Sequence, residues 1–579
     1  MSYREFCADN IFFHRDYNNL RILLLVPHQD DEINTAGALA ATLSKSGADI
    51  ILVYTTNGDW KYPAETRIRE AVNAAGVLGI KHENIVFLGY GDAINSNEHN
   101  HLFYHKEPIE SPSGHKETYG SEFFHDYAYL ETGNHNEYTN INFLNDIISV
   151  IKKYQPDLII CTDFDEHPDH RMLSLYLDRA IGIIRKDEYS YTPEIWKRFA
   201  YSTGYTAEAD YTAINNPETK RPEVRKTGKY AWDLIDTSIY SWNERIRIPI
   251  PKEMRIGDLK KNLLAIALKQ HKSQYIITKA NRIINSDEVY WSRRTDSVAY
   301  SADISVSSGE GHYLNDFLIY DTEDVDSIVP DISGHCWTPE VGDEDRRAVL
   351  TWKAPQHVEE IVLYGEITDK SAASELIIRL SDGYEKYVRN IPTNGNPVRV
   401  DTGSHDDITE CSIEIMKSSG AGITEIEVYA EKEKQSLIQP FAKILIEGNF
   451  VYEYILDSNV RKLDISLYGY ETKGVQITVA EGKSEIVDDK LYLNVDDNEI
   501  VLQASTDNGI IIDQVVIQRK SQNEIKRIKA IDKANIAYLQ SMQRKMKIHN
   551  MLYILRHDGV GAVAKRTLRN VIRPMFMRK

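Results

Sequence analysis

The first half of the chain alternates short apolar runs with Ala- and Leu-rich segments, and this order constrains the fold more than any other feature. The runs are too short for buried helices and are typical of parallel strands covered on both faces. The predicted strands are 21–26, 49–54, 85–88 and 157–161. The predicted helices are 32–46, 64–78 and 141–154. This βαβα order predicts an α/β fold: a Rossmann-like, mostly parallel sheet with helices on both faces.

Beyond about residue 300 the pattern changes to strict alternation of apolar and polar residues, which is typical of strands with one buried face. Turn pairs such as Asp382-Gly383 separate these strands. We expect two β-sandwich domains there, followed by a basic helical tail. The predicted domains are 1–300, 301–432, 433–520 and 521–579.

The charge is distributed unevenly. The chain of 579 residues has a net charge of −19. Residues 521–579 hold 14 Lys and Arg against 3 Asp and Glu, a balance of +11, so the rest of the chain carries −30. An acidic body repels nucleic acid, so we expect no nucleic-acid partner. The tail combines its charge with apolar residues, which leaves two alternatives: an anionic membrane surface or the acidic body of the chain itself.

Three features bear on location. No apolar run approaches the roughly 20 residues that span a bilayer, and the N-terminal residues do not resemble a secretory signal. The four cysteines, Cys7, Cys161, Cys336 and Cys411, are far apart and form no CxxC pair. We therefore expect a cytoplasmic location, with peripheral attachment at the inner membrane face if the tail binds lipid.

Two polar clusters follow predicted strands of the same sheet. His28, Asp30 and Asp31 come directly after the first strand, and His167, Asp169 and His170 come after the fourth. A lone HxxD turn is usually a polar loop, but the carboxyl ends of parallel strands share one edge, so the two clusters can converge. Two histidines, one carboxylate and an open position describe a catalytic zinc site. The same donors also suit Fe²⁺, which remains the alternative metal.

The sequence Pro27–Glu32 (PHQDDE), and the HPDHR sequence that begins at His167, resemble the motifs of the LmbE/PIG-L family of zinc-dependent N-deacetylases. Further matches lie at 67–70, 87–92 and 269–274, and the resemblance covers about residues 20–295. The chain departs from the family pattern at Gln29, where proline is most frequent, and in a long insertion at 93–140.

The resemblance implies a role for each motif residue. His28, Asp31 and His170 would hold the zinc ion. Asp30 would be the general base, since adjacent side chains diverge and Asp31 is the ligand. His167 would stabilise the tetrahedral intermediate or protonate the leaving amine, and Asp169 would orient it.

Four further residues are candidate substrate contacts: Arg67, Asp92, His271 and Gln274. Each has a structural alternative or a weaker basis. Arg67 and Glu70 are helix neighbours that could form an ion pair, and His271 and Gln274 could cap the preceding helix. Asp92 could hydrogen-bond a sugar hydroxyl.

The function that the resemblance implies is a zinc-dependent hydrolase that removes an N-acetyl group from an amino sugar of the N-acetylglucosamine type, in glycan, glycolipid or glycoconjugate metabolism. The alternatives are a glycan-binding or scaffold protein with a degenerate deacetylase domain, and an amidase that acts on thiol conjugates. Residues 301–432 also resemble a galactose-binding-domain-like sandwich, with a packing module as the alternative.

Overall fold

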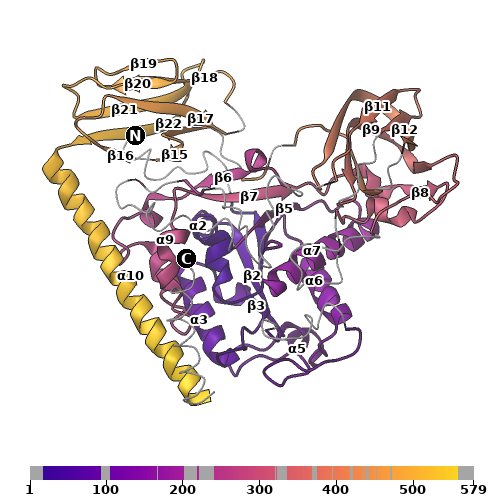
Figure 1. The fold of residues 1–579 in the computed structure, drawn as a ribbon, viewed down its shortest axis with the longest axis horizontal. Helices are drawn as coiled ribbons and strands as arrows, with labels where there is room; N and C mark the ends of the chain where they lie inside the picture. The colour runs from indigo at the N-terminus through magenta and orange to yellow at the C-terminus, as the bar shows by residue number, and fades with distance from the viewer. Residues whose placement is uncertain are drawn as a thin grey trace, which may run out of the picture.

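The structure is a computed structural model, shown in Figure 1. It describes residues 17–92, 105–165, 167–200, 215, 218–220, 240–319, 321, 335–367, 375–393, 395–417, 422–434, 436–438, 442–451, 453–469 and 472–557. Part of the predicted insertion, 93–104, and the end of the predicted tail, 558–579, lie outside the described residues. No described helix has the length and apolar character needed to cross a membrane.

A seven-stranded sheet organises the first part of the chain, in the order β3-β2-β1-β4-β5-β7-β6. Its strands are β1 (Arg21–Val26), β2 (Asp49–Thr56), β3 (Ile85–Tyr90), β4 (Leu158–Thr162), β5 (Glu194–Arg198), β6 (Ile246–Pro249) and β7 (Asp287–Arg293). Strands β1 to β5 pair in parallel, whereas β7 runs antiparallel to β5 and β6 antiparallel to β7. The predicted parallel sheet is confirmed, and the antiparallel edge is an addition to it.

Helices cover both faces of this sheet, as predicted. They are α2 (Asp31–Lys45), α3 (Ala64–Val77), α5 (Tyr127–Thr132), α6 (Asn140–Tyr154), α7 (Pro168–Asp187), α8 (Leu263–Leu268) and α9 (Ala280–Ile283). Successive residues of a strand point to opposite faces. Leu24 of β1 therefore packs with α2, α3 and α8, while its neighbours Leu23 and Leu25 pack with α6 and α7. Both faces of β1 are thus buried, which is why its sequence is apolar throughout.

A single six-stranded antiparallel sheet follows, in the order β11-β10-β12-β9-β13, with β8 paired to β9. Its strands are β8 (Asp303–Val306), β9 (Arg347–Gly365), β10 (Glu375–Leu380), β11 (Glu385–Arg389), β12 (Val398–Lys417) and β13 (Ile423–Tyr429). The ladder between β9 and β12 shifts register three times. Such bulges bend strands, so one long sheet can fold around its own core.

This sheet shares its packing with the α/β part. Phe317 and Tyr364 belong to the same buried cluster as Ile181 of α7. Gly182 permits the approach, because a Cβ atom there would lie 2.0 Å from the carbonyl oxygen of Asp316. The boundary predicted at residue 300 therefore runs beside a continuous hydrophobic core.

The last β region contains two further sheets around a common core, in the orders β15-β14-β17-β20-β19 and β16-β22-β21-β18. The strands are β14 (Lys443–Ile446), β15 (Asn449–Phe450), β16 (Glu453–Asp457), β17 (Lys462–Tyr468), β18 (Val475–Glu481), β19 (Glu485–Val487), β20 (Lys490–Tyr492), β21 (Glu499–Thr506) and β22 (Ile511–Lys520). Two facing sheets with one core are the sandwich predicted for this region.

The chain continues into one long helix, α10 (Gln522–His557), which confirms the predicted helical tail. It runs along the outside of the α/β part, past α9 and α3 (Figure 1). Leu539 is buried against the cluster that contains α2, α3 and α8. The side chain of Asn535 bonds backbone groups of Leu259 and Gly257. The tail thus docks on the body of the chain, which was one of its two predicted positions.

Candidate metal and catalytic site

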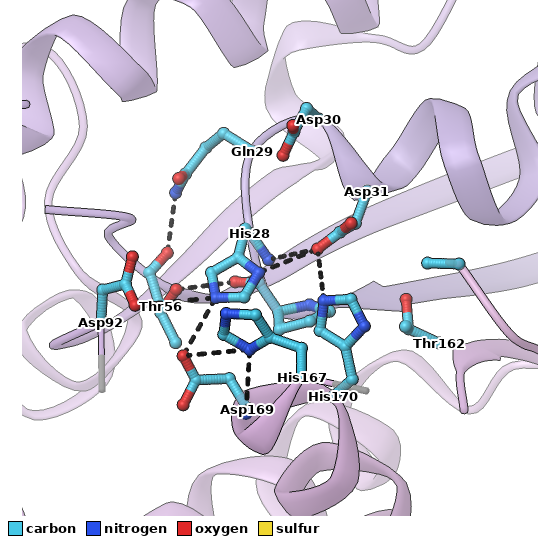
Figure 2. A network of polar contacts seen from close by, with 12 residues as sticks. His28, Gln29, Asp30, Asp31, Thr56, Asp92, Thr162, His167, Asp169 and His170 are labelled. Carbon is cyan, nitrogen blue, oxygen red and sulfur yellow. Dashed lines mark hydrogen bonds and ion pairs between the residues drawn. The ribbon is translucent and has the colours of Figure 1, made fainter. Parts of the chain in front are cut away.

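The two predicted clusters meet at the carboxyl edge of the parallel sheet. Pro27–Asp30 form the turn between β1 and α2, and His167 caps the N-terminus of α7 after β4. β1 and β4 are neighbours in the sheet, so the two turns lie side by side. Figure 2 shows the side chains of His28, Asp31, His167 and His170 gathered between them. The sheet topology, not sequence proximity, brings together residues about 140 positions apart.

Asp31 lies at the centre of the cluster. Its Oδ2 atom is 3.0 Å from Nδ1 of His28 and 3.2 Å from Nε2 of His170. The other carboxylate oxygen, Oδ1, is buried without a hydrogen-bond partner among the described residues. A buried carboxylate oxygen in that state is costly unless a cation neutralises it. Asp31 therefore has the environment of a metal ligand.

The two imidazoles are each held from behind by a second carboxylate. Nε2 of His28 lies 3.0 Å from Oδ2 of Asp169, and Nδ1 of His170 lies 2.8 Å from Oδ1 of Asp165. A metal-binding histidine usually bonds an outer carboxylate through its second ring nitrogen, which fixes the ring and the tautomer. Both histidines show this arrangement, with the other ring nitrogen turned toward Asp31.

These residues fit a bound metal ion. Donors that share a tetrahedral zinc ion lie about 3.3–3.6 Å apart, given zinc–ligand distances of about 2.0–2.2 Å. The separations of 3.0 and 3.2 Å around Asp31 are close to that range. Among the described residues, two overlapping groups of donor atoms lie within 4.8 Å of one another, and neither includes Asp31: His28, His167 and His170, and His28, Asp92, His167 and Asp169. The donors suit zinc or iron, and the geometry does not select between them.

Asp30 is set apart from the donors, as Figure 2 shows. Its side chain is 12% exposed, against 1% for Asp31, so it is the more exposed aspartate of the pair. Its backbone has the unusual φ of 127°. The backbone N–H of Asp30 donates to Oε2 of Glu32, whose Oε1 accepts from Nε2 of His271. The pair Glu32 and His271 thus fixes the position of Asp30 from behind.

Burial raises the pKa of Asp30, the neighbouring charge of Asp31 raises it further, and Arg67 opposes the shift. The guanidinium of Arg67 lies 3.5 Å from Oδ1 of Asp30 and donates to the backbone carbonyl of Gln29. A carboxylate with a raised pKa binds a proton more readily, which a general base requires.

The three imidazoles differ in their affinity for protons. Burial lowers the pKa of His28, but bonds to Asp169 and Asp31 outweigh burial and raise the pKa well above its usual value. Burial is likewise outweighed at His170, where Asp165 and Asp31 raise the pKa to about 9. Burial and then the charges of His28 and His170 hold the pKa of His167 well below its usual value. A metal cation in the place of those charges would act on His167 in the same sense.

The lowered pKa favours the neutral imidazole at His167, and the contacts of the ring indicate its tautomer. Its Nδ1 atom accepts a hydrogen bond of 3.2 Å from the backbone N–H of Asp169. An accepting Nδ1 leaves the proton on Nε2. His167 thus presents an N–H donor to its surroundings.

The predicted substrate contacts lie in different places. Asp92 is at the site, with Oδ1 3.9 Å from Nε2 of His28, and Arg67 reaches Asp30 rather than forming the alternative ion pair with Glu70. Glu70 instead accepts bonds from the backbone and side chain of Ser273. Gln274 is half-buried, and His271 is fully buried behind Asp30. Contact with substrate stays a prediction for all four.

Sequence reasoning missed three residues that hold the site together. Asp165 orients His170, Glu32 holds Asp30, and Asp59 accepts a bond from the backbone N–H of Asp92. Asp165 and Glu32 stand within or beside the two motifs, so an acidic residue near a ligand was the available signal. Asp59 lies in the turn after β2, and only the sheet order shows that this turn borders the site.

Residues 23–181 match the family model described as PIG-L: GlcNAc-PI de-N-acetylase, and this range includes both motifs. No curated protein matches the chain.

Several solved structures are similar to this chain. A deacetylase–teicoplanin complex from the teicoplanin biosynthesis pathway is 16% identical, covers 47% of this chain and 98% of its own, and has a TM-score of 0.28. The N,N'-diacetylchitobiose deacetylase of Pyrococcus horikoshii is 18% identical, with coverage of 33% and 61% and a TM-score of 0.20. The 4-carboxy-2-hydroxymuconate hydratase of Pseudomonas putida is 11% identical, with coverage of 48% and 95% and a TM-score of 0.27. Residues 23–181 match the model of a deacetylase family, which supports a metal-dependent amide hydrolase of the N-deacetylase class.

Proposed function

We propose that the protein is a zinc-dependent deacetylase that removes the acetyl group from an N-acetylated amino sugar of the N-acetylglucosamine type. The observation that carries the proposal is the arrangement around Asp31. Two imidazoles face its carboxylate, and each imidazole also contacts a second carboxylate on its other side. The substrate class is inferred from the description of the matched family, which names a sugar amide.

His28, Asp31 and His170 would hold the zinc ion. When bound, a zinc ion supplies Lewis-acid polarisation of the amide carbonyl and activation of water. The remaining roles belong to residues of the chain that lie beside these three.

Asp30 accepts the proton of the attacking water at a carboxylate oxygen, since it is the partly exposed aspartate beside the donors. Arg67 and Glu32 keep that carboxylate in place. The Nε2–H group of His167 donates to the oxygen that becomes negative as the amide carbon turns tetrahedral. A neutral imidazole suits this role better than protonation of the leaving amine, which was the alternative.

The same site would serve an amidase that acts on thiol conjugates, because both substrates present a secondary amide. A scaffold protein with a degenerate domain is disfavoured, since His28, Asp31 and His170 lie in contact and Asp30 is adjacent to them, as the proposed roles require.

The test is release of acetate by purified, zinc-loaded protein from a panel of N-acetylated sugars, sugar nucleotides, glycolipids and thiol conjugates. We expect turnover of at least one sugar amide and loss of turnover in Asp30→Asn, with zinc still bound. Turnover of thiol conjugates alone would select the amidase. A protein that binds zinc and sugars but releases no acetate would favour the scaffold.

A further inference from the structure

Helix α10 presents two unlike faces. One face docks on the body through Asn535 and Leu539, and its last turns pack against the loop after β2 and against Tyr275. Tyr62 bonds His549 at 3.1 Å, Lys61 bonds Asn550, and the rings of Tyr275 and His549 lie 5.5 Å apart. The rest of the helix is turned away from the body, and this outward face has a composition of its own.

The outward face is cationic along most of its length. At about 100° per residue, Lys526 and Arg544 stand nine residues from Asn535, so they point about 180° away from the docked side. Lys529, Lys533 and Lys547 lie within about 60° of that direction. The two acidic residues of the helix, Glu524 and Asp532, both fall toward the docked side. Positive charge is therefore concentrated where the helix meets solvent.

An apolar stripe continues the same face at the end of the helix. Ile548, Met551, Leu552 and Leu555 follow the i, i+3, i+4, i+7 spacing of one helix face. All four are exposed, by 42% to 54% of their surface. A contiguous exposed apolar patch beside cations is unusual for a surface that only meets water.

We propose that this outward face of α10 binds an anionic lipid bilayer. Cations beside an apolar stripe match the headgroups and the acyl boundary of such a surface, as in other interfacial helices. A soluble polyanion would use the cations but leave the stripe in water. A second copy of this acidic chain could also meet the cations, and it is an outcome of the test below.

The docking of α10 gives this binding a structural consequence. Tyr62 and Lys61, which hold the end of the helix, lie in the loop that follows β2 at the carboxyl edge of the sheet. A bilayer on the outward face would lie about one helix diameter, roughly 10–12 Å, from that loop. The edge that carries the metal site would then stand close to the membrane surface.

The test is cosedimentation of the full chain with vesicles of three parts phosphatidylcholine to one part phosphatidylglycerol, and with pure phosphatidylcholine. We expect binding to the anionic vesicles at low salt, weakened but not abolished at high salt. The triple variant Lys526→Glu, Lys533→Glu, Arg544→Glu should bind about 100-fold more weakly or worse. The double variant Met551→Ser, Leu555→Ser should bind about 10-fold more weakly and lose the salt-resistant part.

The matched controls change charge without touching the face. Lys386→Glu, Lys462→Glu, Lys473→Glu has the same net charge as the first variant and should bind like the unmodified protein. All variants are exposed-site changes, and circular dichroism checks that α10 is retained. Binding is read without turnover, so its result is independent of the proposed deacetylase activity.

Three results would overturn the proposal. Absence of binding to anionic vesicles at low salt removes it. An equal loss of vesicle binding in the control triple variant would show that net charge, not this face of the helix, determines binding. Binding to heparin that is unaffected by the serine variant would assign the face to a soluble polyanion. A dimer in light scattering that dissociates in the charge-reversal variant would assign it to a second copy of the chain.

Discussion

Two buried charged clusters flank α7, and they are built on opposite principles. At the first turn of α7, His28, Asp31 and His170 lie together, and no lysine or arginine of the two motifs supplies a cation to them. About two turns later, Lys197 of β5 supplies the cation itself. Its ammonium group donates to Oδ2 of Asp178 at 2.8 Å and to Oγ and the carbonyl oxygen of Ser174 at 2.9 and 3.2 Å.

The difference distinguishes a candidate functional site, the Asp31 cluster, from a structural ion pair, the Lys197 cluster. An ammonium group has three donors, and three partners use them, so the chain itself supplies the cation of the Lys197 cluster. Oδ1 of Asp178 and Oδ2 of Asp163 are also buried without a hydrogen-bond partner among the described residues, so the supply of the cation is what differs between the clusters. The Asp31 cluster leaves one carboxylate oxygen unpartnered and turns two imidazole nitrogens toward a single acid. Burial alone therefore does not mark function. The informative sign is a cluster that requires a cation from outside the chain.

We expect the largest effect from removal of a metal ligand from the Asp31 cluster. His170→Ala should lose bound metal and all measurable activity, since the remaining donors no longer surround the ion. Metal content by mass spectrometry and acetate release are measured on the same sample. A variant that keeps stoichiometric metal would show that His170 is not a ligand.

Substitution of the base should separate binding from chemistry. Asp30→Asn removes the proton acceptor but no donor, so turnover should fall about 10²–10⁴-fold while metal content stays unchanged. Asp31→Asn is the matched control and should lose metal. If Asp30→Asn loses the metal and Asp31→Asn keeps it, the two roles are exchanged.

Lys197→Met should affect stability alone. Loss of one partner from a buried ion pair costs about 3–5 kcal/mol, because Asp178 remains buried and unpaired. Burial already raises the pKa of Asp178, with Lys197 opposing it, so removal of the lysine should raise that pKa further. A folded pKa above the unfolded value favours the protonated folded protein, so the destabilisation should shrink as pH falls.

Urea unfolding from neutral to mildly acidic pH measures this effect, with the exposed Lys45→Met as a control. Metal content of the folded variant should match that of the unmodified protein. A loss of metal instead would make the two clusters one functional unit.

The smallest effect on the metal site should come from its outer carboxylates. Asp165→Asn leaves all donors but weakens the hold on Nδ1 of His170, so metal affinity should fall about 10–100-fold. Activity should recover at saturating zinc, which a ligand variant cannot do. Titration with a competing chelator measures the affinity.

Much of this could be predicted from the sequence, for identifiable reasons. The strands near 21–26 and 157–161 are buried on both faces, so their apolar runs are visible, and their polar ends mark the site edge. The pairing of Glu32 with His271 spans 239 positions and carries no local pattern. The antiparallel strand β7, which lies between β5 and β6, was missed for a similar reason, since its neighbours are set by the path of the chain rather than by its own residues.

The β regions show the same division. Alternation predicted strands such as β17 and β18, because it reports one buried face per strand. It does not report which strands share a sheet, so the bent sheet of β9 and β12 was expected as two layers. Nor does it show that Phe317 and Tyr364 complete the core beside α7. Because that core is shared, point substitutions are better probes of this region than its deletion.

The backbone of Asp30 has a φ of 127°, which lowers the stability of the fold at a position where the proposed activity needs a carboxylate. Side chains at such angles cost about 1–3 kcal/mol, and only glycine adopts them freely. Asp30→Gly should therefore raise the free energy of unfolding by about 1 kcal/mol while lowering turnover about 10²–10⁴-fold, and Asp30→Asn should lower turnover to the same extent without that gain in stability. Urea unfolding of the pair measures the difference. On this view the fold alone would favour glycine at position 30, and the carboxylate at the mouth of the site is held there at the expense of the protein's own stability.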